Sequence, residues 1–332
     1  MVSCRSVREA SCLAGQMWYP TTRQMLEHRV AKLAACAAFL LLIIGGMVNA
    51  TGSSLACPEA FVVCHKSILP AMTGGVLYEH GHRLAAMTVG TLQIVLTILI
   101  HRRRPELRWL GWLLLGMVLA QGLFGAITVY FKLVWFVSTG HLLLGMSYFA
   151  MLIYTAFRTR PAPSAMELDR HEKLRAELGS ARKWIGIACG AVFCQLLFGA
   201  LVRHFGASLA CIGMPACTAT GDWIPHGVGQ TVHMWHRTFG CIVAIVTTIA
   251  AIKVYRAAPS WLALRRLCVI APILVAAQIT LGVFVVLSLR AVPLAVGHFA
   301  GAASLWALWM SAWLMTGRRQ KKTAVDGELV AL

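Results

Sequence analysis

Charged residues are scarce in this sequence of 332 residues, and acidic residues are the scarcest of them. Asp, Glu, Lys and Arg together make up 13% of the chain, and only 12 residues are acidic. Soluble domains carry about 25% charged residues, so the composition argues against a soluble enzyme. Hydrophobic residues make up 58% of the chain, which predicts a polytopic membrane protein.

Long apolar runs take the place of the missing charges. Eight of them are close to the ~20 residues that a helix needs to cross a bilayer. Backbone groups find no water in lipid, so each run is expected to be a helix. The predicted spans are residues 31–50, 82–100, 109–129, 138–157, 184–202, 237–255, 267–288 and 295–315. The expected fold class is an all-α membrane protein with eight transmembrane helices.

Basic residues gather on one side of the predicted membrane. If both termini are cytoplasmic, most of the 30 Lys and Arg residues fall in cytoplasmic segments, as the positive-inside rule requires. The net charge of +18 then reflects topology, and no nucleic-acid partner is expected. Cytoplasmic segments are predicted at residues 1–30, 158–183 and 317–332. Glu9 and Glu27 are unusual for an organellar presequence, which favours a bacterial inner membrane.

A short sequence that ends in cysteine occurs twice. Residues 53–57 read "SSLAC" and residues 207–211 read "ASLAC", at an offset of 154 residues. In both copies a His-Arg pair follows the cysteine 25 residues later, at residues 82–83 and 236–237. Such a match over two separate motifs indicates a duplicated unit.

The repeat continues into the later helices of each unit. "QGLFGAITV" begins at Gln121 and corresponds to "QITLGVFVV", which begins at Gln278. His141 corresponds to His298, again at an offset of 157 residues. The chain is therefore predicted to form two tandem four-helix bundles related by an axis along the membrane normal.

These two halves have predicted boundaries. The first half covers residues 31–157 and the second covers residues 184–316, with residues 158–183 as a polar linker. With the orientation above, both cysteine loops lie outside the cytoplasm, where disulfides persist.

Each outer loop carries two cysteines. We expect Cys57 to pair with Cys64 and Cys211 to pair with Cys217, because each pair shares one short loop. Free thiols are the alternative, and a bridge that only fixes the loop is another. Other cysteines lie in predicted helices, where a small apolar role suffices.

Four histidines are expected at matched depth near the outer face. His82 and His236 open the second helix of their halves, and His141 and His298 lie near the start of the fourth. Ionisable side chains within spans are costly and usually functional. A single histidine could serve as a hydrogen-bonding bridge between helices, but two per half, duplicated, favour a ligand role. Two imidazoles from facing helices suit the axial positions of a heme iron.

Charged neighbours of these histidines differ between the halves. Arg83 and Arg237 are candidates to bind heme propionates, although extension to the membrane interface is an alternative. Glu79 precedes His82 by three residues, and the matching position in the second half is His233. The difference suggests that one site performs chemistry while the other transfers electrons, unless Glu79 is a solvated loop residue.

These motifs resemble those of heme A synthase, the membrane enzyme of cytochrome oxidase assembly that converts heme O to heme A. The resemblance covers about residues 31–316. It rests on the two cysteine loops, on "EHGHR" and "HMWHR", and on "GHLLLGM" and "GHFAGA" around His141 and His298. It implies that His82 and His141 hold the substrate heme O, and that His236 and His298 hold a resident heme b.

The resemblance also implies a reaction and its partners. One porphyrin methyl group becomes a formyl group by way of an alcohol and a hydrated aldehyde. Glu79 is implied in catalysis, and Cys57 and Cys64 are implied in a functional disulfide, while the second pair, Cys211 and Cys217, is present in only some members of the family. The implied partners are heme O synthase and the cytochrome oxidase assembly machinery. The electron acceptor is unidentified, with a quinone as one candidate, and a homo-oligomer is left open.

Three other functions are compatible with parts of the sequence. A bis-heme, quinol-linked membrane cytochrome would use the four histidines without modifying either heme. A membrane thiol-disulfide oxidoreductase would use the cysteine pairs and leave the histidines without a role. A heme transporter would bind heme without redox turnover.

Overall fold

The structure is a computed structural model that describes residues 25–59 and 62–318. Helices dominate this part of the chain, and strands are absent from it. The helices are α2 (Leu26–Ala50), α3 (Gly74–Arg103), α4 (Arg108–Tyr130), α5 (Trp135–Arg158), α6 (Ala165–Leu178), α7 (Arg182–His204), α8 (Val228–Ala257), α9 (Leu262–Leu287) and α10 (Val292–Met315). Eight helical segments are long and apolar enough to cross a membrane. The predicted class, an all-α multi-pass membrane protein, is confirmed.

The largest differences from the predicted helix starts occur in two helices. Helix α3 begins at Gly74 and helix α8 at Val228, about two helical turns before the predicted starts at residues 82 and 237. The extra turns contain polar side chains such as Glu79 and His233, which make these turns resemble a loop in the sequence. Both side chains are buried beneath the loops that precede their helices, so the helix extends to them.

The predicted polar linker at residues 158–183 contains helix α6, which was not predicted. Ser164 caps its first turn: the Ser164 hydroxyl accepts the Glu167 amide at 3.2 Å, and the Glu167 carboxylate accepts the Ser164 amide at 2.7 Å. This reciprocal capping box is specified by Ser-x-x-Glu at residues 164–167. The signal was therefore present in the sequence.

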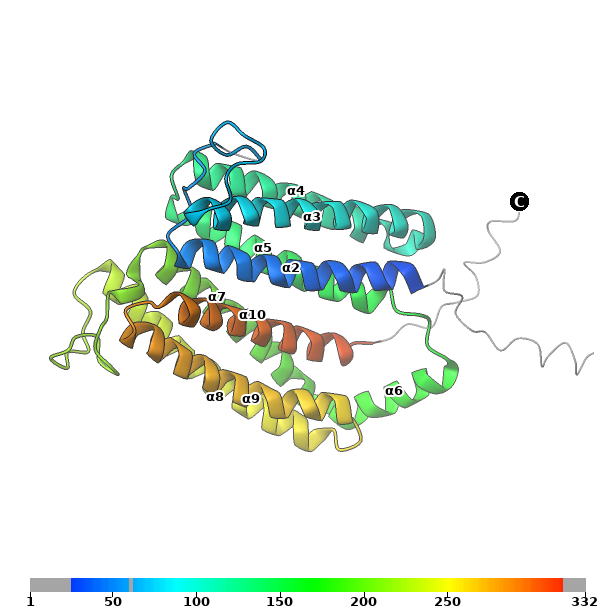
Figure 1. The fold of residues 1–332 in the computed structure, drawn as a ribbon. Coiled ribbons are helices and arrows are strands. Elements are labelled where there is room, and N and C mark those ends of the chain that lie inside the picture. Colours follow the sequence, from blue (N-terminus) through cyan, green and yellow to red (C-terminus); the bar gives the residue numbers. More distant parts are fainter. Residues whose placement is uncertain (1–24, 60–61, 319–332) are drawn as a thin grey trace, which may run out of the picture.

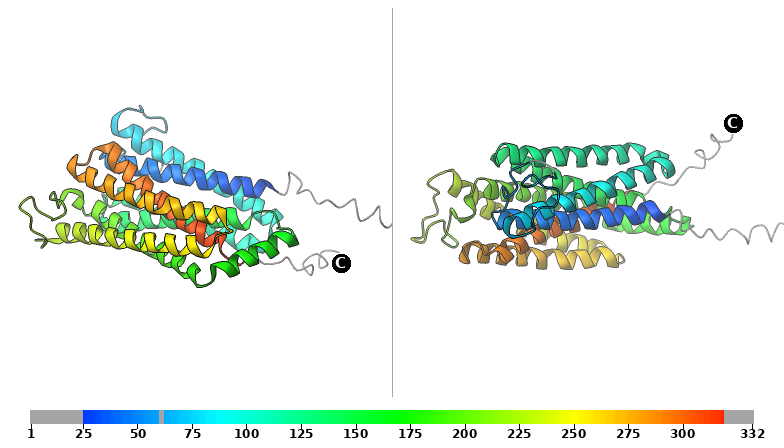
Figure 2. Two further views of the ribbon diagram at one scale, coloured as in Figure 1. Left: turned by 90° about the horizontal axis from the view of Figure 1, so that it is seen from below. Right: turned by 45° about the horizontal axis from the view of Figure 1, so that its top comes forward.

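The long helices run side by side, as the views in Figures 1 and 2 show. Helix α10 contacts α2, α5 and α7, and these four form the centre of the molecule. Helices α3 and α4 pack beside α2 and α5, while α8 and α9 pack beside α7 and α10. These contacts are the ones expected of two four-helix units, and the tandem repeat itself stays a prediction. Residues 51–73 and 205–227 connect helices at one end of the molecule, and α6 lies at the other (Figure 1).

Small side chains allow the central helices to approach closely. Ala31, Ala34 and Ala38 form a buried stripe on α2 at helical spacing. Close packing through small residues is the usual way in which helices associate in a bilayer. Large apolar side chains such as Leu119 and Ile245 are exposed on the outside, as expected of surfaces that contact lipid.

Candidate functional site

Each of the four predicted histidines packs its ring against a glycine of the preceding long helix. A Cβ atom placed on the glycine would lie 3.0–3.4 Å from the Cε1 atom of the histidine. The pairs are Gly45 with His82, Gly125 with His141, Gly199 with His236, and Gly282 with His298. Because glycine has no Cβ, each ring reaches the backbone of the preceding helix.

The glycines follow the same repeat as the histidines. Gly45 and Gly199 are separated by 154 residues, and Gly125 and Gly282 by 157. Gly45 and Gly199 were not predicted as part of the site, although their offset of 154 residues carries the signal. Four ring-on-glycine contacts at repeated positions indicate a construction made twice from one template.

In the second pair of histidines, both Nδ1 atoms lie beside polar groups. The ring centroids of His236 and His298 lie 6.3 Å apart. The Nδ1 atom of His236 lies 3.1 Å from the Gln195 side-chain amide nitrogen, and the Nδ1 atom of His298 lies 3.0 Å from the Gln278 carbonyl oxygen. An imidazole bonds a transition metal at about 2 Å, so one metal ion bound to both rings matches this separation.

The first pair of histidines has fewer polar contacts. The Nδ1 atoms of His82 and His141 are buried and make no hydrogen bond. Gln121 donates to the His141 carbonyl oxygen at 2.9 Å, as Gln195 does to that of His236 at 3.0 Å. The position on α2 that matches Gln195 is Leu41, which has no amide to donate.

Both pairs fit a heme as judged from these residues. Each pair offers two imidazoles from different helices. A side chain in place of any of the four glycines would occupy the space of the histidine ring. The Nδ1 atoms of the first pair make no hydrogen bond. Two axial histidines are a common ligand set for an electron-transferring heme iron. The two histidines of each pair are therefore sufficient as axial ligands of a heme, and no carboxylate ligand is needed.

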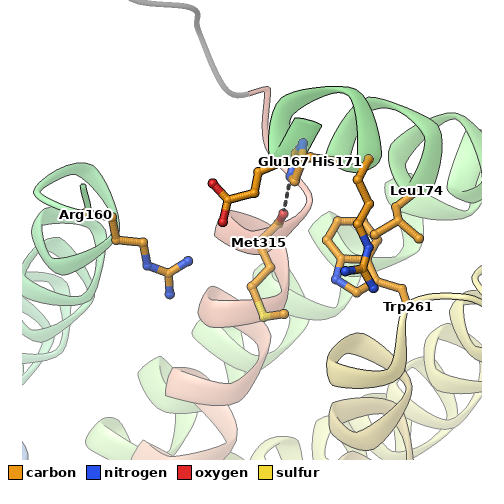
Figure 3. A pocket seen from close by; sticks show the side chains of 7 residues that line it. Arg160, Glu167, His171, Leu174, Trp261 and Met315 are labelled. Carbon is orange, nitrogen blue, oxygen red and sulfur yellow. Dashed lines mark hydrogen bonds between the residues drawn. The ribbon is translucent and has the colours of Figure 1, made fainter. Parts of the chain in front are cut away.

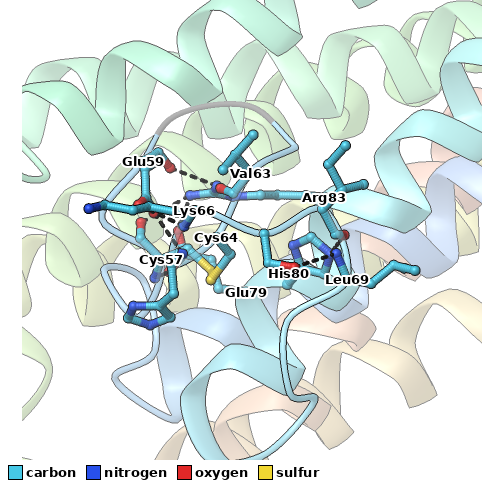
Figure 4. Close-up of a disulfide and its surroundings, with 12 residues drawn as sticks. Cys57, Glu59, Val63, Cys64, Lys66, Leu69, Glu79, His80 and Arg83 are labelled. Atoms are coloured by element: carbon cyan, nitrogen blue, oxygen red, sulfur yellow. Dashed lines mark hydrogen bonds and ion pairs between the residues drawn. A yellow bond between two sulfur atoms is a disulfide. The ribbon is translucent and has the colours of Figure 1, made fainter.

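The first outer loop is closed by a disulfide (Figure 4). Cys57 and Cys64 have sulfurs 2.01 Å apart, and both residues are fully buried. Arg83 grips this loop from α3: its guanidinium donates to the carbonyl oxygens of Glu59 at 2.7 Å, Val63 at 2.9 Å and Cys57 at 3.2 Å. The predicted pairing is present, and the arginine fastens it to the helix that carries His82.

Glu79 belongs to the same network. The residue is 4% exposed; one carboxylate oxygen accepts the Cys57 amide at 2.8 Å and the other accepts Arg83 at 2.7 Å. Because α3 begins at Gly74, Glu79 lies one turn before His82 on the same helix. The alternative of a solvated loop acid is therefore wrong.

The second outer loop repeats this design with one exchange. Cys211 and Cys217 form a disulfide, and Arg237 donates to the carbonyl oxygens of Cys211, Gly213 and Ala216. The Cys211 amide donates to Nδ1 of His233 at 3.3 Å. His233 thus occupies the place that Glu79 occupies in the first half.

This geometry affects the predicted role of the two arginines. The guanidinium groups of Arg83 and Arg237 contact loop carbonyl oxygens, so they organise the outer loops in this structure. Their contact with heme propionates stays a prediction.

His80 is a residue whose environment the sequence did not reveal. Its side chain is fully buried, its Nε2 atom lies 3.1 Å from the Ile68 carbonyl oxygen, and its Nδ1 atom makes no hydrogen bond. One of its ring nitrogens lies within 4.8 Å of the sulfurs of Cys57 and Cys64. The structure places His80 at the disulfide rather than beside His141.

A hollow at the opposite end of the molecule is unrelated to these residues (Figure 3). It is lined by Arg160, Glu167, Arg170, His171, Leu174, Trp261 and Met315. The His171 ring contacts the Met315 carbonyl oxygen at 2.9 Å, which fastens α6 to the end of α10. None of the predicted site residues lines this hollow.

Comparisons with known proteins find similarity over most of the chain. The COX15-CtaA family model, described as cytochrome oxidase assembly protein, matches residues 71–310. The heme A synthase of Macrococcus caseolyticus is 30% identical over 270 residues, which cover 78% of this chain and 87% of that protein. The heme A synthase of Geobacillus kaustophilus is 30% identical over 280 residues, covering 80% and 84%. That of Bacillus cereus strain ATCC 14579 is 26% identical over 322 residues, covering 92% and 99%.

Because each arginine binds the carbonyl oxygens of its own loop, replacing it should change the reduction rate of the disulfide in that loop alone. Arg83→Met removes three bonds to loop carbonyls, each worth about 1.5–3 kcal/mol for a charged donor, so local opening becomes easier. We expect reduction of Cys57–Cys64 by a water-soluble phosphine to accelerate about tenfold or more, with Cys211–Cys217 unchanged.

Arg237→Met is the matched variant and should have the reverse selectivity. Alkylation of the released thiols with a mass label, followed by peptide mapping, measures both bridges in one sample. Equal acceleration of both bridges by either variant would show that the arginines do not hold their own loops.

Proposed function

The chain belongs to the COX15-CtaA family of cytochrome oxidase assembly proteins, and we propose that it is a heme A synthase. It oxidises one methyl group of heme O to a formyl group and so supplies heme A for terminal oxidases. The observation that carries this proposal is the pair of duplicated histidine sites, each ring held against a glycine. The similar proteins named above are heme A synthases, which supports the same activity here.

The two sites have different roles in this proposal. His82 and His141 hold the substrate heme O, and His236 and His298 hold a resident heme b. Hydrogen bonds to the second nitrogen of a ligating histidine orient the ring and strengthen metal binding by about 10–100-fold. His298 has such a contact, because its Nδ1 atom faces the Gln278 carbonyl oxygen, whereas the Nδ1 atoms of the first pair have no partner. This supports a permanent heme in the second site and an exchangeable one in the first.

The reaction proceeds in two oxidations at one carbon atom. In each, a C–H bond is replaced by a bond to an oxygen atom taken from water, and two electrons and two protons are released. The first gives an alcohol and the second a hydrated aldehyde, which loses water to become the formyl group. Heme b, when bound, supplies one-electron transfer toward an acceptor outside the chain, for which a quinone is our candidate.

Glu79 serves this reaction from the substrate half. It lies one turn before His82, so its carboxylate is available to take up protons released beside that histidine. Its two oxygens are held by the Cys57 amide and by Arg83, which connects proton uptake to the disulfide loop. His233, at the matching position, has a neutral acceptor nitrogen facing Cys211 instead of a carboxylate. The halves therefore share a framework and differ in chemistry.

We place the protein in a bacterial inner membrane with both cysteine loops on the periplasmic side. The basic residues of the central segment and the chain ends support this orientation, and the similar proteins come from bacteria. Heme O synthase, as the source of the substrate, and cytochrome oxidase assembly, as the destination of the product, are the proposed partners.

The resident heme can be tested with a pair of variants on one helix. Gly199→Val places a side chain where the His236 ring lies, whereas Gly190→Val adds one at a position with open space. We expect the low-spin heme b spectrum of the purified protein to be lost in Gly199→Val and kept in Gly190→Val. His236→Ala and His298→Ala should also lose it, and an unchanged spectrum in both would refute the ligand assignment.

The role of Glu79 can be tested without disturbing heme b. Glu79→Gln keeps the size and the contact with the Cys57 amide but loses the charge, so heme A formation should stop while heme b is retained. Heme O or its alcohol should accumulate. Extracted pigments from cells that make heme O are separated by chromatography, with His233→Gln as the matched variant, which should still yield heme A. A normal heme A yield from Glu79→Gln would make the carboxylate a bystander.

A further inference from the structure

The end of helix α7 carries a cation to which the proposed reaction gives no role. Arg203 reaches across from the second half and donates to the Gly45 carbonyl oxygen on α2 at 2.9 Å. Its guanidinium carbon lies 5.3 Å from the centre of the Phe299 ring. Its Nε atom is buried and makes no hydrogen bond. The guanidinium group therefore has donor capacity that the protein does not use.

A second arginine lies at the same end of α2. Arg290, in the turn between α9 and α10, donates to the Asn49 carbonyl oxygen at 3.3 Å. Among the described residues, neither Arg203 nor Arg290 forms an ion pair with a carboxylate. Cations within a membrane protein are costly unless they are paired, so this location favours an anionic ligand.

Arg203 is adjacent to the first histidine pair. Gly45, whose carbonyl it binds, is the glycine against which the His82 ring packs. The unpaired cation thus faces the site assigned to the substrate.

We propose that Arg203, assisted by Arg290, binds a propionate carboxylate of the porphyrin held between His82 and His141. Arginine is suited to this task because its planar donors match a carboxylate in a bidentate, charge-assisted manner. This inference rests on the proposed function, since it takes the first site as the substrate site. It makes Arg203 a positioning residue that the second half contributes to the first.

The matching residue in the first half is different. Residue 49 corresponds to residue 203 at the offset of 154, and it is Asn49. The second site therefore has no equivalent arginine from the first half. Since the first site also lacks hydrogen bonds at the Nδ1 atoms of its histidines, a propionate anchor would hold a substrate that the iron ligands hold less firmly.

A purely mechanical role must be separated from this one. Arg203 also fastens the carboxyl end of α2, where a cation is favourable for the helix dipole. Arg182, at the other end of α7, makes the same kinds of contact: it donates to the Thr316 carbonyl oxygen at 3.0 Å and lies over the Trp313 ring. Arg182→Met is therefore a matched control for loss of a helix-fastening arginine.

The experiment compares heme O with its propionate dimethyl ester, which has no carboxylate. Purified protein with heme b in the second site is titrated with each compound, and binding is followed by heme absorbance. His82→Ala identifies the signal of the first site. We expect the native protein to bind the free acid about tenfold to a hundredfold more tightly than the ester, the value of hydrogen bonds to a charged group.

Arg203→Met should lose this preference and keep its affinity for the ester. Arg203→Lys should restore part of the preference, and Arg182→Met should retain all of it. An equal loss of affinity for both compounds in Arg203→Met, or no preference in the native protein, would overturn the inference. Absence of any His82-dependent binding would instead overturn the proposed function, and the inference with it.

Discussion

The close contact between a histidine ring and a glycine of the neighbouring helix is the constraint on which the rest of the molecule depends. It occurs four times, with 3.0–3.4 Å between the ring and the position of a glycine Cβ. The bilayer core provides no water to hydrogen-bond an imidazole. A histidine within a membrane-spanning helix is therefore expected to bind a ligand or another polar group. The glycines fix how near the helices approach and where each ring can turn. The same contact at matching offsets is consistent with the predicted tandem repeat.

The halves keep this construction and differ around it. In the second half both Nδ1 atoms have polar partners, whereas in the first half both lack one. Glu79 receives the Cys57 amide where His233 receives that of Cys211. Arg203 stands where the first half has Asn49. In the function proposed above, these exchanges separate a site that binds and releases the substrate from a site that retains its heme.

The outer loops are connected to these sites through α3 and α8. On each helix the arginine directly after the histidine binds loop carbonyls around a disulfide. Each loop is therefore joined to the helix turn that carries His82 or His236. In the first half Glu79 joins the network through its ion pair with Arg83 and its contact with the Cys57 amide.

The sequence was sufficient to predict the parts of the fold that depend on composition and repetition. Eight apolar runs predict eight spans because only long apolar helices are stable in lipid. The offset of 154 residues by itself shows that Glu79 corresponds to His233. Side-chain partners across the fold could not be predicted in this way. Arg83 was a candidate to bind a propionate, and nothing in the sequence indicated that its donors contact the carbonyl oxygens of Cys57, Glu59 and Val63. Arg203 was not singled out because its partner, Gly45, is brought near only by helix packing.

The most direct test of the central claim is the conversion of heme O in bacterial cells that make heme O and have no heme A synthase of their own. The native protein and a variant that combines His82→Ala with His141→Ala are expressed in parallel, and the extracted hemes are separated by chromatography. We predict heme A from the native protein, and only heme O and heme b from the variant, whose second site keeps its heme. Unchanged heme O in cells with the native protein, or heme A in cells with the variant, would contradict the claim.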